Sequence, residues 1–346
     1  MEKLTDALKV IEFKIKFITP LLIHGENSRA DTIGLTGKAL RGCWRFWFRA
    51  LIGGLIDNIE PKKLLELESK IFGSADDKVG AKFRIYLQEL GQREKIEAYV
   101  GFKYTEGRKR GEEAKSEGYK EGIEYKITII PRKEEFPKEI LLSAIWLWAN
   151  LGGVGQRARR GFGSPAIELI DKIANPFKTE NLELHTKSEF QTSEEIKGHL
   201  TDGLKKVWQI FEQWIPNNSG HKITGDISKN DEPANANYFI LKSIKQIGVG
   251  NEVFSDLKEA IEAIHGNHNC DELGWVDLHN NKPSKRMASP VLTRLYKVNS
   301  GFIPIITWCN QNGVLPNCNS PTGCVQLYLK KAKFDNSSWL TGSPNE

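Results

Sequence analysis

The chain has 346 residues, of which 39% are hydrophobic and 27% charged, and its formal net charge is only +5. This balance is typical of a globular protein, and the length is sufficient for two domains. No apolar run reaches the roughly 18 residues of a membrane span, and no secretory signal is recognisable, so we expect neither insertion nor export. Five cysteines, an odd number, then indicate reduced thiols in a cytoplasm. With so small a net charge, nucleic-acid binding would have to come from local clusters of cations.

The first half predicts a strand, a helix, two strands, a helix and a strand. Residues 9–19 alternate apolar and polar side chains, which predicts a half-buried strand. The same reasoning predicts the other elements, namely strands at 81–90, 123–131 and 164–170 and helices at 36–52 and 138–151. The polar, glycine-rich stretch 103–122 predicts a mobile hairpin tip or a disordered loop. The order is that of a ferredoxin-like (RRM-like, βαββαβ) α+β domain, whose sheet leaves one face open to a ligand or partner.

The second half repeats this pattern more loosely. The composition becomes polar after residue 173, so we expect one domain at 1–173 and another at 174–346. The predicted elements are helices at 198–215 and 251–265 and strands at 237–245, 291–298, 301–308 and 324–334. Long loops separate them. A second, tandem ferredoxin-like domain with long insertions fits this order best.

The first predicted helix has a face that carries only cations. It begins after a plausible N-cap, Thr36, and Gly53-Gly54 is a plausible stop. At 100° per residue, an arc of about 80° contains the four cations, Lys38, Arg41, Arg45 and Arg49. Arginines at this spacing repel one another unless an anion lies across them, either an acid from elsewhere in the fold or a phosphate backbone. Trp44 lies at the flank of this face and is either a platform for base stacking or part of the core.

A second basic segment, residues 151–165, combines five glycines with three arginines. Glycines such as Gly153 and Gly155 allow backbone amides to approach an anion, and Phe162 could stack on a base. The arginines, Arg157, Arg159 and Arg160, could hold phosphates. The segment follows a helix and precedes a strand, so it is neither a P-loop nor a dinucleotide-binding turn. It predicts a contact with single-stranded RNA, with a flexible linker as the alternative.

Two of these segments resemble the RAMP superfamily of CRISPR-associated proteins. The glycine-x-x-leucine-basic-glycine-x-x-arginine signature of that family is matched by Gly37, Leu40, Arg41, Gly42 and Arg45. Residues 152–164 look like its C-terminal glycine-rich loop. Together with "RMASP" at 286–290, the chain most resembles the large subunits with two ferredoxin-like domains at the head of type III-B (Cmr) effector complexes. The resemblance implies an RNA-binding subunit of a CRISPR RNA-guided antiviral complex.

Three further groups of residues are candidates. Residues 284–297 add Lys285, Arg286 and Arg294, which would face the same RNA or only protect an edge strand from aggregation. His24, with Lys38 or Tyr104, could supply acid–base catalysis of RNA cleavage, although a loop histidine is more often a surface residue. The group His265, His268 and Cys270, with Cys309, Cys318 or Cys324, does not have the spacing of a common zinc site. We therefore expect no metal and no cofactor.

The sequence thus predicts a non-catalytic RNA-binding protein that works in a cytoplasmic ribonucleoprotein. Its expected partners are CRISPR RNA, single-stranded target RNA or both, and the other RAMP subunits of a Cmr complex, with no membrane. The alternative is a metal-independent endoribonuclease that uses His24 to process CRISPR RNA. A third possibility is a scaffold that contacts proteins only.

Overall fold

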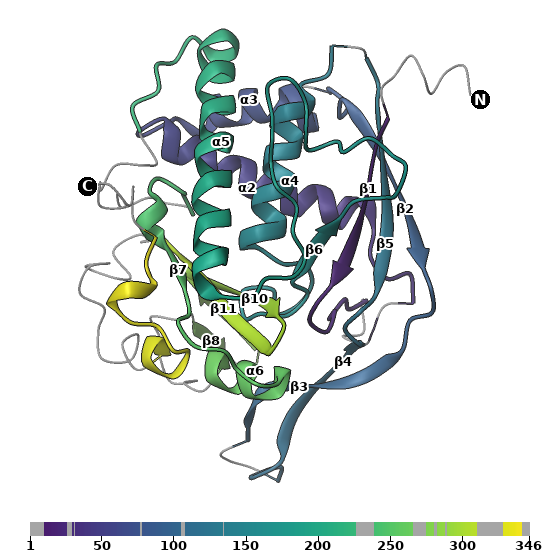
Figure 1. Ribbon diagram of the computed structural model, residues 1–346, viewed down its shortest axis with the longest axis vertical. Coiled ribbons are helices and arrows are strands. Elements are labelled where there is room, and N and C mark those ends of the chain that lie inside the picture. The colour runs from purple at the N-terminus through teal and green to yellow at the C-terminus, as the bar shows by residue number, and fades with distance from the viewer. Residues whose placement is uncertain are drawn as a thin grey trace.

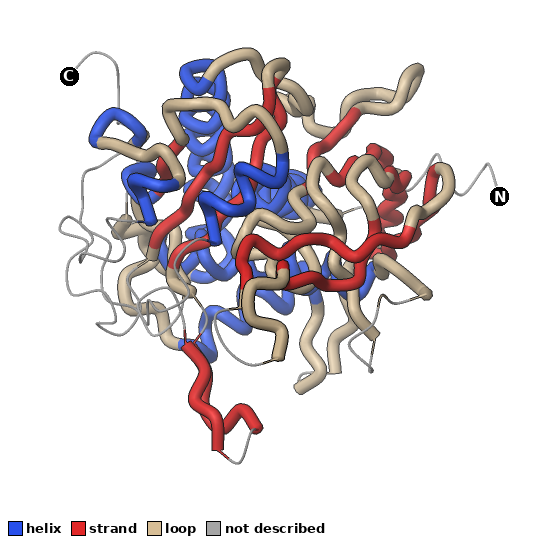
Figure 2. Tube along the Cα trace, turned by 90° about the horizontal axis from the view of Figure 1, so that it is seen from below, coloured by secondary structure: helices blue, strands red, loops and turns tan. Residues whose placement is uncertain are grey.

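The structure is a computed structural model, and it describes residues 10–25, 30, 32–76, 78–104, 108–133, 135–225, 239–265, 275–279, 282–287, 289–309 and 328–340. Over these residues the fold mixes helices with antiparallel strands, as predicted for an α+β protein. The strands form one four-stranded, one three-stranded and two two-stranded sheets. Figure 1 shows the four-stranded sheet on one side of the helices, and the view from below in Figure 2 shows separate groups of strands.

The four-stranded sheet is built from the first half of the chain. Its strands, in the spatial order β2-β5-β1-β6, are β2 (Phe83–Leu90), β5 (Glu124–Pro131), β1 (Ile11–Phe17) and β6 (Pro165–Glu168). Along β1, buried and half-buried residues alternate, because successive side chains point to opposite faces of the sheet. The four strands predicted in this half are confirmed.

Four helices pack together beside this sheet, and they are α2 (Gly37–Leu55), α3 (Pro61–Phe72), α4 (Lys138–Leu151) and α5 (Ser193–Ser219). The Thr36 side chain accepts a hydrogen bond from the amide of Ala39, which confirms the predicted N-cap. Gly53-Gly54 does not stop α2, because the helix continues to Leu55. Gly54 instead lets another backbone approach, since a Cβ there would lie 2.0 Å from the carbonyl oxygen of Leu241.

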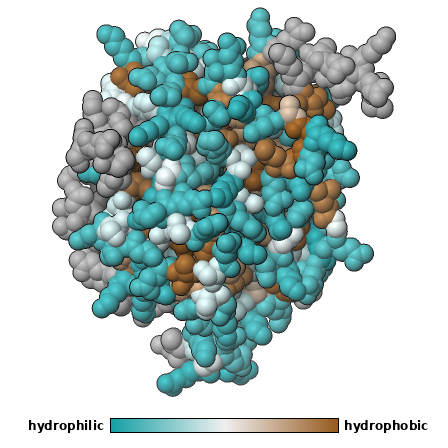
Figure 3. Space-filling model, in the orientation of Figure 1, coloured by the Kyte–Doolittle hydropathy of each residue, from teal (hydrophilic) through white to brown (hydrophobic). Residues whose placement is uncertain are grey.

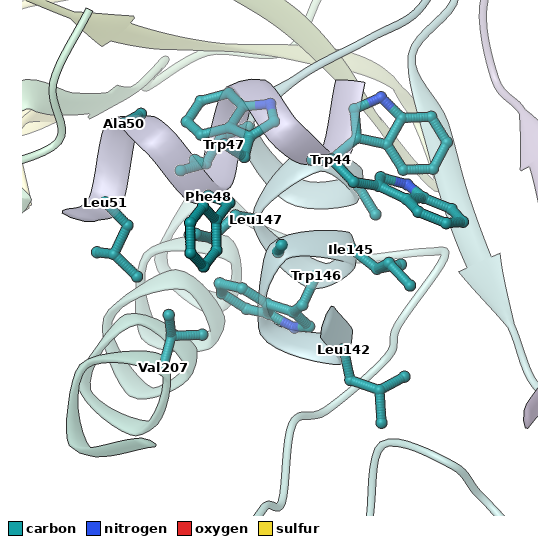
Figure 4. Close-up of a cluster of buried hydrophobic side chains, with 14 of the residues drawn as sticks. Trp44, Trp47, Phe48, Ala50, Leu51, Leu142, Ile145, Trp146, Leu147 and Val207 are labelled. Carbon is teal, nitrogen blue, oxygen red and sulfur yellow. The ribbon is translucent and has the colours of Figure 1, made fainter. Parts of the chain in front are cut away.

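The hydrophobic core lies where α2, α4 and α5 meet. Figure 4 shows Trp44, Trp47 and Phe48 of α2 above Trp146 of α4, with Val207 of α5 at the edge of the cluster. The rings of Phe48 and Phe211 are 5.7 Å apart, so α5 packs on the helices of the first half. Within the described residues, no helix is both long and apolar enough to cross a membrane.

The second face of the four-stranded sheet is polar, with cations and acids in balance. Lys14 lies 3.3 Å from Glu168, and Lys126 lies 2.9 Å from Glu12. These ion pairs leave no concentrated positive charge on this sheet face. The side of the molecule seen in Figure 3, in the orientation of Figure 1, is mostly hydrophilic with scattered apolar side chains.

The segment 103–122 was predicted to be a mobile hairpin tip or a disordered loop, and the hairpin is confirmed, whereas disorder is contradicted for residues 113–119. Glu113–Tyr119 is a strand, β4, paired with β3 (Lys95–Lys103) in a hairpin. The amide of Tyr119 donates to the carbonyl oxygen of Leu21, and its ring is 2% exposed. The few apolar and small residues of this polar stretch suffice to pack it against residues 21–22.

The second half contains the three-stranded sheet, in the order β10-β11-β7. Its strands are β7 (Ile247–Val249), β10 (Val291–Val298) and β11 (Gly301–Trp308). The other elements are α6 (Leu257–His265), the hairpin of β8 (Trp275–His279) and β9 (Lys282–Met287), and the 3₁₀ turns Ile244–Gln246 and Asn336–Ser338. The predictions for β10 and β11 are confirmed, and so is the end of the helix predicted at 251–265.

Two predicted strands of the second half are wrong. Residues 239–243 form no strand, because the Gln246 side chain accepts hydrogen bonds from the amides of Lys242 and Ser243 and holds a turn there. Residues 328–331 are helical, while 324–327 lie outside the described residues. Tyr328 and Ala332, four residues apart, are both buried, so the apolar spacing here is that of a helix.

Candidate nucleic-acid interface

Two of the four cations on α2 share a single acid within the fold. Arg45 and Arg49 both form ion pairs with Glu68 of α3, whose side chain is fully buried. One carboxylate offsets only one of the two positive charges, and the arginine side chains stay 34% and 44% exposed, so their contact with phosphates remains a prediction. Of the two explanations left open by the sequence, an acid from elsewhere in the fold is present, and it leaves room for a phosphate as well.

The position of Glu68 follows from the pattern of α3. Its neighbours on the buried side, at i−4, i−1, i+3 and i+4, are Leu64, Leu67, Ile71 and Phe72. Glu68 thus stands on the apolar face of the helix, where an acid is rare unless it is paired. Sequence reasoning missed this residue, although an acid within an apolar stripe was a visible signal.

The N-terminal half of α2 remains open. Lys38 is exposed and Arg41 half-buried, and neither forms an ion pair with any described residue. Gly42 is exposed too, and a Cβ added there would meet nothing within 4 Å. A glycine inside a helix costs about 1 kcal/mol relative to alanine, and no packing within the chain requires it here. This turn of α2 offers two unpaired cations beside bare backbone.

The two aromatic residues predicted to stack on bases are core residues. Trp44 is fully buried, and its ring centroid lies 6.3 Å from that of Trp148 and 6.4 Å from that of Phe83. Phe162 is also fully buried, with its ring 5.9 Å from that of His265. Both predictions are contradicted. The packing of helices on the sheet encloses the ring of Trp44, and the residues around His265 enclose the ring of Phe162.

The glycine-rich loop, residues 152–164, is anchored to the turn after β1. The amide of Gln156 donates to the carbonyl oxygen of Leu22 at 2.7 Å, and that of Gly163 donates to Pro20 at 2.9 Å. Gly155 has φ +92°, and a Cβ there would lie 2.5 Å from the carbonyl oxygen of Leu22. The glycines therefore serve a close, fixed approach between two backbones, and the alternative of a flexible linker is contradicted.

The three arginines of this loop lie on aromatic rings. Arg157 lies over Phe102 of β3 at 5.5 Å, Arg159 over Phe46 of α2 at 5.7 Å, and Arg160 over Tyr328 at 5.9 Å. Such stacking fixes a guanidinium in place while leaving its charge intact.

The charges of Arg157 and Arg159 are not neutralised by the fold. Neither forms an ion pair with a carboxylate among the described residues. Partial burial and the charge of Arg160 lower the pKa of both groups, which indicates a site that lacks negative charge. Arginine nevertheless stays protonated, so a bound anion would stabilise the loop.

The same loop presents backbone amides that have no partner. Within the part of the chain that the structure describes, five N–H groups find no acceptor, those of Gly153, Gly155, Arg157, Ala158 and Arg159. Successive backbone amides in a tight loop form a concave set of donors that suits anions. These amides and the two guanidiniums without ion pairs among the described residues are the observations from which an anion contact can be proposed.

The loop and α2 lie side by side. Burial raises the pKa of Cys43 to about 12, so its thiol stays protonated and donates to the carbonyl oxygen of Gly153 at 3.7 Å. Phe46, one turn further along α2, carries the guanidinium of Arg159. The loop therefore packs on α2 at Cys43 and Phe46, while no contact among the described residues joins it to Lys38 or Arg41.

Of the cations predicted in the second half, Arg294 is not at the surface. Arg294 is only 2% exposed, and its Nη2 donates to the carbonyl oxygen of Pro165, so its predicted role as a phosphate contact is contradicted. Lys285 and Arg286 lie in β9, whose side chains are outside the description. Arg159 joins the two halves instead, because it also donates to the carbonyl oxygen of Ser289.

His24 is held by the β3–β4 hairpin. Its Nε2 lies 2.7 Å from the carbonyl oxygen of Glu117 and 3.4 Å from Oγ of Ser116, and a carbonyl can only accept, so Nε2 is a donor. No contact joins it to Lys38 or Tyr104 among the described residues.

Of the histidine–cysteine group, His265 is buried with Nε2 at 3.2 Å from the carbonyl oxygen of Arg160. Cys309 is buried, and its Sγ accepts from the amide of Ile240. His268, Cys270, Cys318 and Cys324 lie outside the described residues.

These features define a class of protein, namely mixed α/β chains that have antiparallel sheets and a glycine-rich, basic loop. In this chain the loop connects α4 to β6. Residues 14–168, which end within β6, match the RAMP superfamily. "CRISPR system Cmr subunit Cmr1-2" of Pyrococcus furiosus is 30% identical over 185 residues, which cover 46% of this chain and 96% of that protein. "CRISPR system Cmr subunit Cmr1-1" of the same organism is 31% identical over 208 residues, and the match spans 56% of its length. The chain belongs to the CRISPR-associated RAMP superfamily, in the family of Cmr1.

Solved structures support the fold over most of the chain. The crystal structure of apo Cmr1 from Pyrococcus furiosus aligns with a TM-score of 0.54 at 20% identity and covers 86% of both chains. A chain of the type III-B Cmr-beta complex bound to cognate target RNA and AMPPnP aligns with a TM-score of 0.56 at 13% identity, over 93% of this chain and 98% of that one. The likeness therefore includes the second half, beyond the residues matched by the superfamily.

Proposed function

We propose that this chain is a non-catalytic RNA-binding subunit of a type III-B, CRISPR RNA-guided antiviral complex. The observation that carries the proposal is the glycine-rich loop, where Arg157 and Arg159 are fixed on aromatic rings beside unpartnered amides and without a carboxylate. Such a site recognises phosphates rather than bases, so it suits a guide or target strand of any sequence. Its relatives, whose names place them in Cmr systems, support the same assignment.

The surface that we assign to RNA consists of the loop amides of Gly153 and Gly155, the arginines of the loop, and the open turn of α2. The latter contributes Lys38 and Arg41. The bound strand is CRISPR RNA, single-stranded target RNA or both, and the neighbouring subunits are other RAMP proteins. We keep Lys285 and Arg286 of β9 as further candidates, because β9 precedes the segment 289–293 that contacts the loop.

The tandem ferredoxin-like architecture is part of this proposal. The order β2-β5-β1-β6, with α2 and α4 as the crossovers, is that of the ferredoxin-like fold. In the second half, the order β10-β11-β7 continues to Trp339, which bridges to Gly248 of β7. With α6 and the helical residues 328–331 as crossovers, residues 247–339 then repeat the same order. A boundary near 173/174 remains a prediction, and in this assignment residues 174–246 are an insertion packed on the first repeat.

RNA titration tests the assignment. We expect Arg157→Glu to weaken binding of a labelled single-stranded RNA at least about tenfold, which is about 1.4 kcal/mol, in fluorescence anisotropy at low salt. The binding constant should also depend less steeply on salt. On a single strand, each lost phosphate contact reduces the slope of the logarithm of the binding constant against the logarithm of the salt concentration by about 0.7. Arg84→Glu, the same charge change at an exposed position on β2, is the control. Equal losses in both variants would mean that only net charge matters.

The rival activity, cleavage of CRISPR RNA precursors, has a separate test. The chain is incubated with repeat-containing RNA and a chelator, and the products are compared with those of His24→Ala. We expect no defined products from either, because Nε2 of His24 is engaged with Glu117. Products that depend on His24 would establish the endoribonuclease instead.

A further inference from the structure

A further guanidinium without an ion pair among the described residues lies inside the protein. Arg294 of β10 is 2% exposed and stacks on Tyr296, with its Cζ 4.1 Å from the ring centroid. Its Nη2 donates to the carbonyl oxygen of Pro165 at 2.9 Å, and Nε contacts that of Leu295. Nη1 is buried and finds no acceptor, and no carboxylate pairs with the side chain, in the part of the chain that is described. A buried charge in this state is costly unless something else compensates it.

Arg294 borders a small cavity between the two halves of the chain. The cavity has a volume of about 10 Å³ and is lined by Arg294, Asn150, Pro165, Thr186, Ser188 and Tyr296, among others. A cavity of this size accommodates one group about as large as a water molecule. Oγ1 of Thr186 is buried there, and it also has no hydrogen-bond partner among the described residues. Two donors without acceptors thus border the same small space.

Arg294 is the cation at the cavity that has no carboxylate partner among the described residues, because Lys187, which also lines it, pairs with Glu195. Burial, together with the charges of His185, Arg294 and Lys187, lowers the pKa of His199 to about 4, so this imidazole is neutral near pH 7. His199 is linked to the site through Asn150, whose Oδ1 accepts from Tyr296 at 2.6 Å and from His199 at 2.9 Å. The nearby Glu195 is already engaged by Lys187 and by the amide of Gln191.

We propose that this cavity binds a small anion, which accepts hydrogen bonds from Nη1 of Arg294 and Oγ1 of Thr186. Its size admits a halide such as chloride, or a single oxygen of a larger oxyanion such as inorganic phosphate. The bound anion neutralises Arg294 where the end of α4, the start of β6 and β10 meet. It therefore fastens the second half of the chain to the first, and it does so independently of RNA.

Thermal unfolding in matched salts tests the site. The whole chain is melted in potassium chloride, potassium phosphate and potassium methanesulfonate at equal ionic strength. We expect the melting temperature to be higher in chloride than in methanesulfonate by about 2–5 °C, and this difference to saturate with concentration. The reason is that a ligand that binds only the folded state stabilises it by mass action. If phosphate raises the melting temperature by this amount or more and chloride does not, the occupant is an oxyanion.

Variants separate specific binding from general salt effects. Thr186→Val should weaken the chloride response and Arg294→Met should abolish it, whereas Arg84→Met at an exposed position should retain it. A response that is equal in all salts, or that survives in both site variants, would overturn the proposal, and water would then occupy the cavity. Should Arg294→Met fail to fold, Thr186→Val and an anomalous bromide peak in crystals of the unaltered chain decide the question.

Discussion

The cationic face of α2 and the glycine-rich loop look equally basic in the sequence, yet the fold treats them differently. On α2, Arg45 and Arg49 both pair with the buried Glu68, which offsets one of their two charges. In the loop, Arg157 and Arg159 rest on aromatic rings and have no carboxylate partner among the described residues. The difference teaches that stacking holds a cation without offsetting its charge, while an internal ion pair offsets part of the charge and ties the side chains to the fold.

Removing both arginines that pair with Glu68 should have the largest effect. Arg45→Ala with Arg49→Ala leaves a carboxylate that is fully buried and unpaired, and breaking such a pair costs about 3–5 kcal/mol. The measurement is the free energy of unfolding in urea. Adding Glu68→Leu should restore most of the loss, since an apolar residue of similar size is often as stable as a buried ion pair. A double variant as stable as the unaltered chain would remove the distinction between the two regions.

These same residues show which features of the fold and the site can be predicted from the sequence. The periodicity of residues 9–19 and 36–51 predicts β1 and α2, because local patterns decide which face is buried. The partner of a charge depends on tertiary packing, so Glu68, fully buried against α2, could be suspected only from its place on an apolar stripe. The rings beneath Arg157 and Arg159 come from strands and helices distant in the chain.

The same limit explains the errors in the second half. Tyr328 and Ala332 are spaced for a helix, but the stretch 324–334 also contains alternating apolar residues, and only packing decides between them. Arg294 looked like one more surface cation, because burial of a charge leaves no mark in a strand of mixed composition. The concentration of arginines in the loop could be read from the sequence, while the burial of Arg294 could not.

The open turn of α2 should affect RNA rather than folding. The double variant Lys38→Glu, Arg41→Glu changes two side chains that form no ion pair with the described residues. The free energy of unfolding should therefore change by no more than about 0.5 kcal/mol. RNA affinity should fall at least about tenfold, because attraction to phosphate becomes repulsion beside the loop. Thermal unfolding and RNA anisotropy are measured on the same samples. Arg84→Glu with Lys133→Glu, both exposed, matches the change in net charge. If the double variant loses stability but keeps its RNA affinity, then Lys38 and Arg41 serve the fold, as the ion pairs of Arg45 and Arg49 do, and do not contact RNA.

Gly42 gives the smallest and sharpest test of the comparison. A methyl group there would meet no atom of the described residues within 4 Å, so Gly42→Ala should stabilise α2 by about 0.5–1 kcal/mol. Gly198→Ala is a matched control, because Gly198 is also an exposed glycine inside a helix, α5, with open space around its missing Cβ. Both variants should melt higher than the unaltered chain, but only Gly42→Ala should weaken RNA binding, by about threefold or more, if a phosphate backbone lies directly against the helix. Unchanged affinity in both would mean that Lys38 and Arg41 reach RNA at the length of their side chains, and that the backbone of α2 is not part of the contact.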